Sequence, residues 1–375
     1  MGGNGVEGEP DQQKLYGKQH YGSCRRHGAP ACCGRDTGWP DRATPSPAAP
    51  ATPAPAKSSG RTPTITSMSA WNHSLNAAGI QEPQLRKDYG IQRRLVARFR
   101  RASYLAARLL LPRAALPHVV AATAFMHHGD NLLDTGPRSQ RATAWAIWEQ
   151  DVRKALDTGA SDDPLIRTLL HTMGAYPRLR EVLEEYLSTA TADLEFTRFT
   201  TEGDYQAYVD AYSLPGFMLI ASLLGPEDDD GRFRAGCRTF IDAGQRLDFT
   251  NDLAEDLREG RLGIPLETLE RFSVTVEDLA AGHAAAGVEQ LIVHQVTAAR
   301  TGLEAAGELT SLVAAPYRAL VGALIEIELL TAEAALARGA GLLRGPASPP
   351  VAGTLRVLFN ARRKARVAPT GEEAS

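Results

Sequence analysis

The distribution of apolar positions along the chain predicts helices almost throughout. From about Gln84 onward, apolar residues recur at intervals of three and four, whereas few segments alternate as strands do. Glycine and proline residues mark the breaks between segments. The longest expected helices are "VVAATAFMHHGDNLLD", "LREVLEEYLSTATADLEF", "FIDAGQRLDFTNDLAEDL" and "PYRALVGALIEIELLTAEAALARGAGLL". So much helix in one stretch predicts an all-α fold, a single large bundle over residues 84–345.

The two ends of the chain depart from this pattern. Residues 1–67 are rich in Gly, Pro, Ala, Thr and Ser, and they hold too few large apolar groups to offset the entropy of ordering them. We expect a disordered arm, with Met68 as a candidate for the true start of translation. Residues 346–375 are expected to be a basic, partly disordered tail. Its amphipathic part is either a solvated terminus or a contact with anionic lipid.

Composition narrows the class of protein. The formal net charge of −3 gives no reason to expect a nucleic-acid partner, and no run of apolar residues is long enough to predict a membrane span. Four cysteines in 375 residues do not make a disulfide framework, so a reducing, cytoplasmic environment is expected. Cys24, His27, Cys32 and Cys33 lack the paired spacing of a zinc site, and we interpret them as incidental residues of the arm.

Two sets of aspartates are spaced by one helical turn. Asp248, Asp252 and Asp256 follow one another at intervals of four, and Asp130 and Asp134 form a second set. Neighbouring carboxylates on one helical face repel each other, more so among apolar residues that exclude water. The sequence therefore predicts cations between the two sets. Hard carboxylate oxygens suit Mg²⁺, which shares its coordination with phosphate oxygens, so a diphosphate bridged by magnesium is expected.

Departure of an allylic diphosphate from such a site would leave a carbocation. The aliphatic surface of the neighbouring helices would then shape the prenyl chain and keep water from the cation. Arginine forks would hold the diphosphate oxygens. Arg258 and Arg261 follow the second aspartate set, whereas Arg100 and Arg101 lie on an early helix ahead of Tyr104.

A structural interpretation competes with this one. A single pair of aspartates one turn apart is most often a solvated helix face. Two sets within apolar helices favour a site instead. A histidine such as His127 is ordinarily an interior or surface residue without a role in a site. Only the helical face that it shares with Asp130 and Asp134 makes it a candidate site residue.

These residues resemble the squalene and phytoene synthase family, whose members join two prenyl diphosphates head to head. The resemblance runs from about Arg98 to Gly345. It is carried by "RASYLAARLLLP", "DNLLD", "DLEFTRFTTEGDYQAYVDAYSLPG" and, most specifically, "QRLDFTNDLAEDLREGRLGIP". The resemblance implies an all-α isoprenoid synthase fold and the use of Mg²⁺.

The family motifs imply roles for individual residues. Asp130 and Asp134 match the first metal-binding pair, and Asp252 and Asp256 match the second. Gln245 and Arg261 fall on family positions as well. The metal ligands implied by residue types and resemblance together are Asp130, Asp134, Asp248, Asp252 and Asp256. The candidates for binding the substrate diphosphate are Arg258, Arg261, Arg100, Arg101, His127, Gln245 and Tyr104.

The chain also departs from the family. Asp248 stands where an asparagine is usual, and the late tyrosine has no counterpart. Other departures are His127 and Asn251 in place of arginines, Gly263 in place of a tyrosine, and Pro215 with Gly216 in a helix they are expected to break or kink. Loss of these polar groups with retention of every metal aspartate favours a terpene synthase that ionises one farnesyl or geranylgeranyl diphosphate.

Two alternatives remain open. One is the family's head-to-head condensation of two prenyl diphosphates. The other is a non-catalytic isoprenoid-binding scaffold, which the retained aspartates disfavour because buried carboxylates without cations are destabilising. The sequence leaves NADPH use, the substrate's chain length, the product skeleton and the oligomeric state open.

Overall fold

The computed structural model describes residues 69–226, 231–282 and 285–367. Within these ranges the regular elements are helices, accompanied by one isolated bridge between Arg198 and Leu262, so the predicted all-α fold is confirmed. The expected arm over residues 1–67, with its cysteines, lies outside the described residues, as does Met68. No described helix is both long enough and apolar enough to cross a bilayer.

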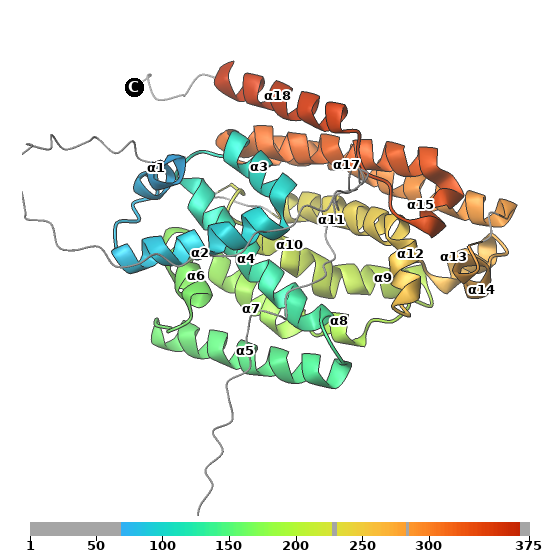
Figure 1. The fold of residues 1–375 in the computed structure, drawn as a ribbon, viewed down its shortest axis with the longest axis horizontal. Helices are drawn as coiled ribbons and strands as arrows, with labels where there is room; N and C mark the ends of the chain where they lie inside the picture. Colours follow the sequence, from blue (N-terminus) through green and yellow to red (C-terminus); the bar gives the residue numbers. More distant parts are fainter. Residues whose placement is uncertain (1–68, 227–230, 283–284, 368–375) are drawn as a thin grey trace, which may run out of the picture.

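Long helices alternate with short ones along the chain, and α5 and α17 are the longest at 21 residues each (Figure 1). Their bounds are α1 (Ala70–Ala77), α2 (Pro83–Phe99), α3 (Arg101–Leu110), α4 (Ala115–Asp134), α5 (Arg138–Thr158), α6 (Pro164–Ala175), α7 (Leu179–Thr189), α8 (Ala192–Glu195), α9 (Glu202–Tyr208), the π-helical turn η2 (Val209–Ser213), α10 (Leu214–Ala221), α11 (Arg232–Asn251), α12 (Leu253–Arg258), α13 (Leu266–Arg271), α14 (Val276–Ala280), α15 (Ala286–Ala305), η3 (Ala306–Glu308), α16 (Leu309–Leu312), η4 (Ala315–Tyr317), α17 (Arg318–Arg338), η5 (Gly339–Arg344) and α18 (Val351–Val367).

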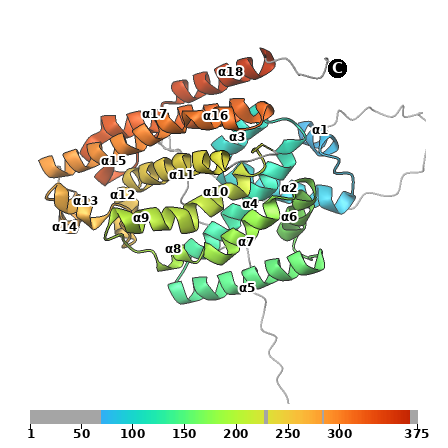
Figure 2. The same cartoon turned by 180° about the vertical axis from the view of Figure 1, so that it is seen from behind.

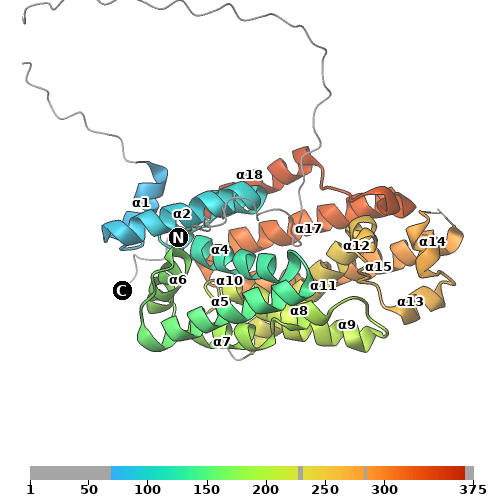
Figure 3. The ribbon, with the colours of Figure 1, turned by 60° about the horizontal axis from the view of Figure 1, so that its bottom comes forward.

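Two central helices, α4 and α11, organise the bundle (Figure 3). Helix α4 is buried along most of its length and packs against α2, α5, α6 and α10, while α11 packs against α10, α15 and α17. The apolar core forms two clusters. One surrounds α4, and the other lies between α11, α15 and the end of α17. Helix α18 is outermost beyond α17, on the opposite side of the bundle from α5 (Figures 1 and 2).

Several helix ends follow from local sequence. The Asp163 carboxylate accepts two backbone N–H groups at the start of α6, and Pro164 occupies the first helical position, where a missing N–H does no harm. Thr201 and Asp204 form a reciprocal capping box at the start of α9. Helix α5 ends at Gly159, whose φ of 70° is a conformation that glycine adopts without steric conflict.

The stretch expected as one helix over "FIDAGQRLDFTNDLAEDL" is two helices, and that expectation is wrong at one residue. Asp252 stands between α11 and α12 with φ −94° and ψ 11°. Its N–H still donates to the Asp248 carbonyl at 2.8 Å, and the Asp256 N–H donates to the Asp252 carbonyl at 3.0 Å. The chain therefore turns without losing its hydrogen bonds, and Asp256 belongs to a separate short helix. In the same way, "LREVLEEYLSTATADLEF" is divided between α7 and α8.

Pro215 and Gly216 were expected to break or kink the mid-chain helix. No break occurs, because a wider turn precedes them. Helix α9 continues through the π-helical turn η2 into α10. A π turn leaves room for a proline ring and accounts for its missing N–H, and such turns recur at functional sites.

The bundle extends beyond the expected limits of 84–345. Helix α1 packs on α4 ahead of that range, and α18 packs on α17 and α3 beyond it. Residues 351–367, expected as part of a partly disordered tail, are helical, while 368–375 lie outside the described residues.

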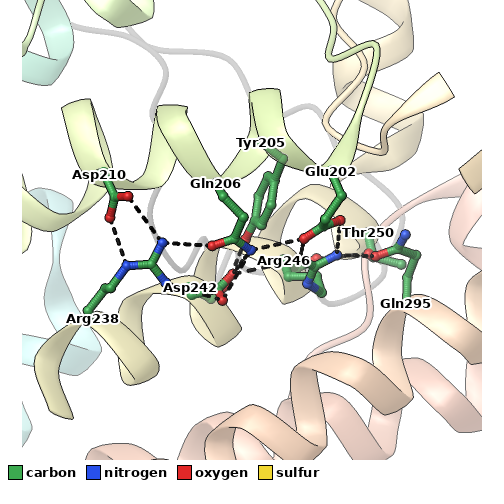
Figure 4. A network of polar contacts seen from close by, with 9 residues as sticks. All are labelled: Glu202, Tyr205, Gln206, Asp210, Arg238, Asp242, Arg246, Thr250 and Gln295. Atoms are coloured by element: carbon green, nitrogen blue, oxygen red, sulfur yellow. Dashed lines mark hydrogen bonds and ion pairs between the residues drawn. The ribbon is translucent and has the colours of Figure 1, made fainter. Parts of the chain in front are cut away.

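Polar contacts fasten the side of α11 that meets α9 and η2 (Figure 4). The Arg238 guanidinium donates to Asp210 at 2.7 Å and to Gln206 at 2.8 Å. About two turns further along α11, Arg246 is bound to Glu202 and lies 4.4 Å from the centre of the Tyr205 ring. These contacts fix the rotation of α11 relative to the segment formed by α9 and η2.

Candidate active site

The first aspartate of α4 is buried and only partly satisfied. Asp130 Oδ1 accepts a hydrogen bond from the Tyr212 hydroxyl at 3.0 Å. Its Oδ2 accepts no hydrogen bond, and a guanidinium nitrogen of Arg100 lies 3.8 Å away. Burial raises the pKa of Asp130 from 3.8 to about 8, against the opposing effect of Arg100. One oxygen of this carboxyl group therefore lacks a hydrogen bond, and burial disfavours its negative charge. A bound cation would contact that oxygen and stabilise the charged form.

The second aspartate of α4 shares an arginine with a carboxylate from elsewhere in the chain. Arg261 lies 3.1 Å from Asp134 and 3.5 Å from Asp193, and its guanidinium lies 5.0 Å from the centre of the Phe196 ring. The Tyr208 hydroxyl donates to Asp193 at 2.7 Å. Burial is the largest cause that raises the pKa of both carboxyls, to about 6 for Asp193, and Arg261 opposes the rise.

The second aspartate set lines a narrow pocket together with Asp134 of the first set, whereas Asp130 is absent from its lining. The residues that line this carboxylate pocket are Asp134, Asp193, Tyr208, Tyr212, Gln245, Asp248, Phe249, Asp252, Asp256 and Arg261. Within it the Ser213 hydroxyl donates to Gln245 at 3.0 Å, which holds that amide toward η2. Burial raises the pKa of Asp256 to about 7, with Arg261 opposing the rise and Asp252 adding to it.

An apolar cavity of about 250 Å³ adjoins the carboxylate pocket. Its walls come from α2, α3, α4, α10, α11, α16 and α17, and most of its lining side chains are aliphatic or aromatic. Arg100, Asp248 and Glu328 are the charged residues in this lining. Asp248 lines both the apolar cavity and the carboxylate pocket. The two linings together have the chemistry that suits a ligand with a charged head and an apolar chain.

The carboxylates suit a Mg²⁺ ion that also binds phosphate oxygens and water. They suit a metal ion coordinated by protein side chains alone less well. Across the described residues, no three His, Cys, Asp or Glu side chains are grouped closely enough to hold a metal ion. Magnesium needs only one or two carboxylates when phosphate oxygens and water complete its shell. Asp130 and Asp256, one from each aspartate set, are buried carboxyl groups with raised pKa values, and both suit this role.

The candidate diphosphate-binding residues separate into two groups. Arg261 and Gln245 line the carboxylate pocket. Arg100 and Tyr104 line the apolar cavity, where Arg100 lies 3.8 Å from Asp130. Arg258 and Arg101 are exposed and line neither space. In each arginine pair named from the sequence, one member therefore lies at the candidate site and the other is exposed to solvent.

His127 is a poor anion partner in this arrangement, because its ring is buried and neutral. The side-chain amide of Asn131 lies 3.2 Å from its Nε2, and the Phe99 ring lies 5.3 Å away. Burial lowers the pKa of His127 to about 3, with Arg100 contributing. The ring is absent from the lining of both spaces.

Sequence reasoning missed three residues that hold the aspartates. Asp193, Tyr208 and Tyr212 all lie in the segment "DLEFTRFTTEGDYQAYVDAYSLPG". The spacing of Tyr208 and Tyr212 by one turn was the available signal, since it places both hydroxyls on one helical face. Their partners lie far along the chain or in another helix, and spacing alone does not reveal them.

A helical bundle with facing aspartates beside an apolar cavity defines an isoprenoid synthase type of protein. The family model for squalene/phytoene synthase matches residues 97–351. The chain belongs to the squalene/phytoene synthase family, a family of enzymes that act on prenyl diphosphates.

Two curated relatives illustrate the similarity. The bifunctional protein CrtB/UppS of Streptomyces coelicolor is 28% identical over 251 residues, which are 67% of this chain and 44% of that protein. This chain thus corresponds to less than half of that relative. The phytoene synthase of Arthrospira platensis is 25% identical over 237 residues, 59% of this chain and 75% of that protein.

Solved structures agree on the fold. The squalene synthase HpnC from Alicyclobacillus acidocaldarius has a TM-score of 0.61 at 26% identity, over 72% of this chain and all of that one (100%). A dehydrosqualene synthase crystallised with a ligand has a TM-score of 0.66 at 17% identity, over 78% of this chain and 99% of that one, which supports the fold alone. The preference for a single substrate is not confirmed by these comparisons, which favour the head-to-head alternative.

Proposed function

We propose that this protein is a Mg²⁺-dependent synthase that joins two prenyl diphosphates, farnesyl or geranylgeranyl, head to head. The observation that carries the proposal is the position of Asp248 in the lining of both the carboxylate pocket and the apolar cavity. A diphosphate bound at Asp248 would lie beside the end of a prenyl chain in the cavity, which supports the proposal. The relatives named as squalene and phytoene synthases support the two-substrate form of the reaction.

The carboxylates form two sets in different parts of the bundle, and each set would hold magnesium. Asp130 and Asp134 would bind from α4, Asp248 from α11, Asp252 from the junction between α11 and α12, and Asp256 from α12. When bound, Mg²⁺ supplies neutralisation of the diphosphate and withdraws charge from the leaving oxygen.

The protein's own polar groups position this arrangement. Tyr212 and Tyr208 donate to Asp130 and Asp193 and so fix the orientation of these carboxyl planes. Arg261 already binds two carboxylates and would turn part of its fork to the diphosphate oxygens. Gln245, held by Ser213, would donate its amide N–H groups to the same ligand.

The apolar cavity governs the fate of the cation that ionisation leaves. The bond between C1 and oxygen of one substrate breaks, and both electrons leave with the diphosphate. The allylic cation is then attacked by the double bond of the second substrate, and a proton is lost from the adduct. Aliphatic and aromatic walls exclude the water that would otherwise capture the cation.

A single-substrate terpene synthase is the second candidate, and one observation favours it. Arg100 and Arg261, the arginines that line the two spaces, are both already ion-paired with aspartates. Two diphosphates carry more negative charge than one and need more cations to hold them. A single diphosphate makes the smaller demand on this site.

Product analysis separates these candidates. The full chain with Mg²⁺ is offered farnesyl and geranylgeranyl diphosphate separately, diphosphate release is measured, and products are extracted for mass spectrometry. A product with twice the carbon count of the substrate supports head-to-head condensation. A product with the substrate's own carbon count assigns the single-substrate reaction instead. No diphosphate release with either substrate would contradict both and favour a binding scaffold.

A further inference from the structure

Helix α18 presents an apolar stripe to solvent. Val351, Leu355 and Phe359 are 75%, 56% and 68% exposed. Their spacing of four places them along one side of the helix, while Val357, Leu358 and Ala361 on the other side are buried against the bundle. A solvent-facing stripe of large side chains on an otherwise well-packed helix is typical of an interaction surface.

The same helix carries positive charge without a compensating acid. Its cations are Arg356, Arg362, Arg363, Lys364 and Arg366, and the sequence of α18 contains no Asp or Glu. No ion pair among the described residues involves any of these five cations. Arg362 and Arg366 continue the stripe that Leu355 and Phe359 begin, at helical intervals of three and four. The outward side thus passes from apolar to basic along its length.

Helix α3 extends this surface and connects it with the apolar cavity. It packs against α18, and its Leu105 is 44% exposed, with exposed Arg101 and Arg108 four residues before and three residues after it. Other residues of α3, including Tyr104 and Ala107, line the apolar cavity. One short helix therefore separates that cavity from the outer surface.

We infer that α18, together with α3, docks the protein on an anionic lipid bilayer. The apolar side chains match the acyl layer of such a membrane, and the cations beside them match its acidic headgroups. A purely apolar partner surface would not explain the cations. The cations are attracted to the acidic headgroups, and Leu355 and Phe359 enter the interface. Docking through these two helices is independent of which reaction the site performs.

Vesicle co-sedimentation of the full chain tests the docking surface. The probes are vesicles of phosphatidylcholine alone and of phosphatidylcholine mixed with phosphatidylglycerol. The wild type should sediment with the mixed vesicles and stay in solution with the neutral ones. Each cation removed, as in Arg363→Gln, should weaken the partition about fivefold. Phe359→Ser should weaken it roughly tenfold through the lost apolar contact.

A matched control lies on the far side of the bundle. Ile147 on α5 is 58% exposed, and Ile147→Ser should leave vesicle binding unchanged. Equal binding to neutral and mixed vesicles, or equal losses in the Phe359 and Ile147 variants, would overturn the inference. It would also be overturned if the wild type bound no vesicles and Phe359→Ser dissociated a dimer in sedimentation velocity, since a second copy would then cover the stripe.

Discussion

The carboxylate pocket and the apolar cavity are both built on the two central helices, but one has a charged lining and the other an apolar one. In and beside the pocket, carboxyl groups from α4 and α8 are held by tyrosine hydroxyls and by Arg261. In the cavity, the walls are aliphatic and aromatic, and charge enters through few residues. Along α11 the change occurs within two turns, from Ile241 to Asp248. The difference teaches that one helix can bind a diphosphate and its hydrocarbon chain by changing residue type along a single side.

Removal of one carboxylate from the candidate site should have the largest effect on activity. Asp252→Asn or Asp130→Asn should lower diphosphate release by about 10²- to 10³-fold, as removal of one electrostatic group from a reacting site does. Steady-state release with saturating Mg²⁺ measures this. Asp157→Asn, an exposed aspartate on α5, is the matched control and should retain full activity. Rates within a few-fold of wild type for both Asp252 and Asp130 variants would remove the assignment of the pocket.

Replacement of the arginine fork tests the pocket more gently. Arg261→Lys keeps the charge but cannot span Asp134 and Asp193 together, so kcat/KM should fall roughly 10- to 100-fold. Arg258→Lys changes an exposed arginine three residues away and should have no effect. Equal losses in the two variants would mean that the position of Arg261 in the pocket is not what matters.

The cavity should respond in substrate choice rather than in overall turnover. Leu324 lines the cavity, and Leu324→Trp would shorten the space for a prenyl chain. The ratio of kcat/KM for geranylgeranyl over farnesyl diphosphate should fall by about tenfold, a typical effect of a few methylene-sized clashes. Competition between the two substrates measures the ratio directly. Glu326→Trp, on an exposed position of the same helix, should leave it unchanged.

The smallest effect concerns the carboxyl group on the cavity wall. Burial raises the pKa of Glu328 from 4.5 to about 7, so the folded state holds a proton that the unfolded chain releases near pH 4.5. This group's stabilising contribution is complete below pH 4.5 and is lost as the pH rises to about 7. Glu328→Gln keeps the neutral form. The free energy of unfolding of this variant should exceed that of wild type by about 1 to 3 kcal/mol at pH 8 and should equal it near pH 4.

Urea unfolding at the two pH values measures this difference. Since the side chain is partly exposed, the lower end of the range is expected. Glu326→Gln is the control and should show no pH-dependent gain. A constant difference between Glu328→Gln and wild type across pH would mean that the carboxyl is ionised in the folded protein.

Periodicity predicted the bundle and the aspartate helices because both signals are local. Helix α4 runs to Asp134 as its apolar pattern indicates, and the facing aspartates follow from residue type and spacing. The choice between Arg258 and Arg261 depended on a turn. Gly260, with φ 74°, ends α12 and directs Arg261 back, so that its N–H donates to the Asp256 carbonyl at 2.8 Å. The glycine was visible in the sequence, although the direction of the next side chain was not.

The remaining parts of the site depend on contacts between distant segments. Tyr212 meets Asp130 across 82 positions, and Arg261 meets Asp134 across 127. The packing of η2 on α4 and α11 decides these meetings, and no local pattern specifies it. The π-helical turn itself was also missed, because Pro215 predicted a break and the wider turn accommodated it.

Calorimetric binding of an unreactive substrate analogue tests most directly whether the two regions form one site. Farnesyl thiolodiphosphate and its shorter geranyl counterpart are titrated into the full chain with and without Mg²⁺. We predict binding that requires Mg²⁺, because the aspartates repel a bare diphosphate, and that tightens with chain length, because the longer chain fills more of the apolar cavity. Binding that is equal with and without Mg²⁺, or equal for the two chain lengths, would contradict a single site shared by the pocket and the cavity.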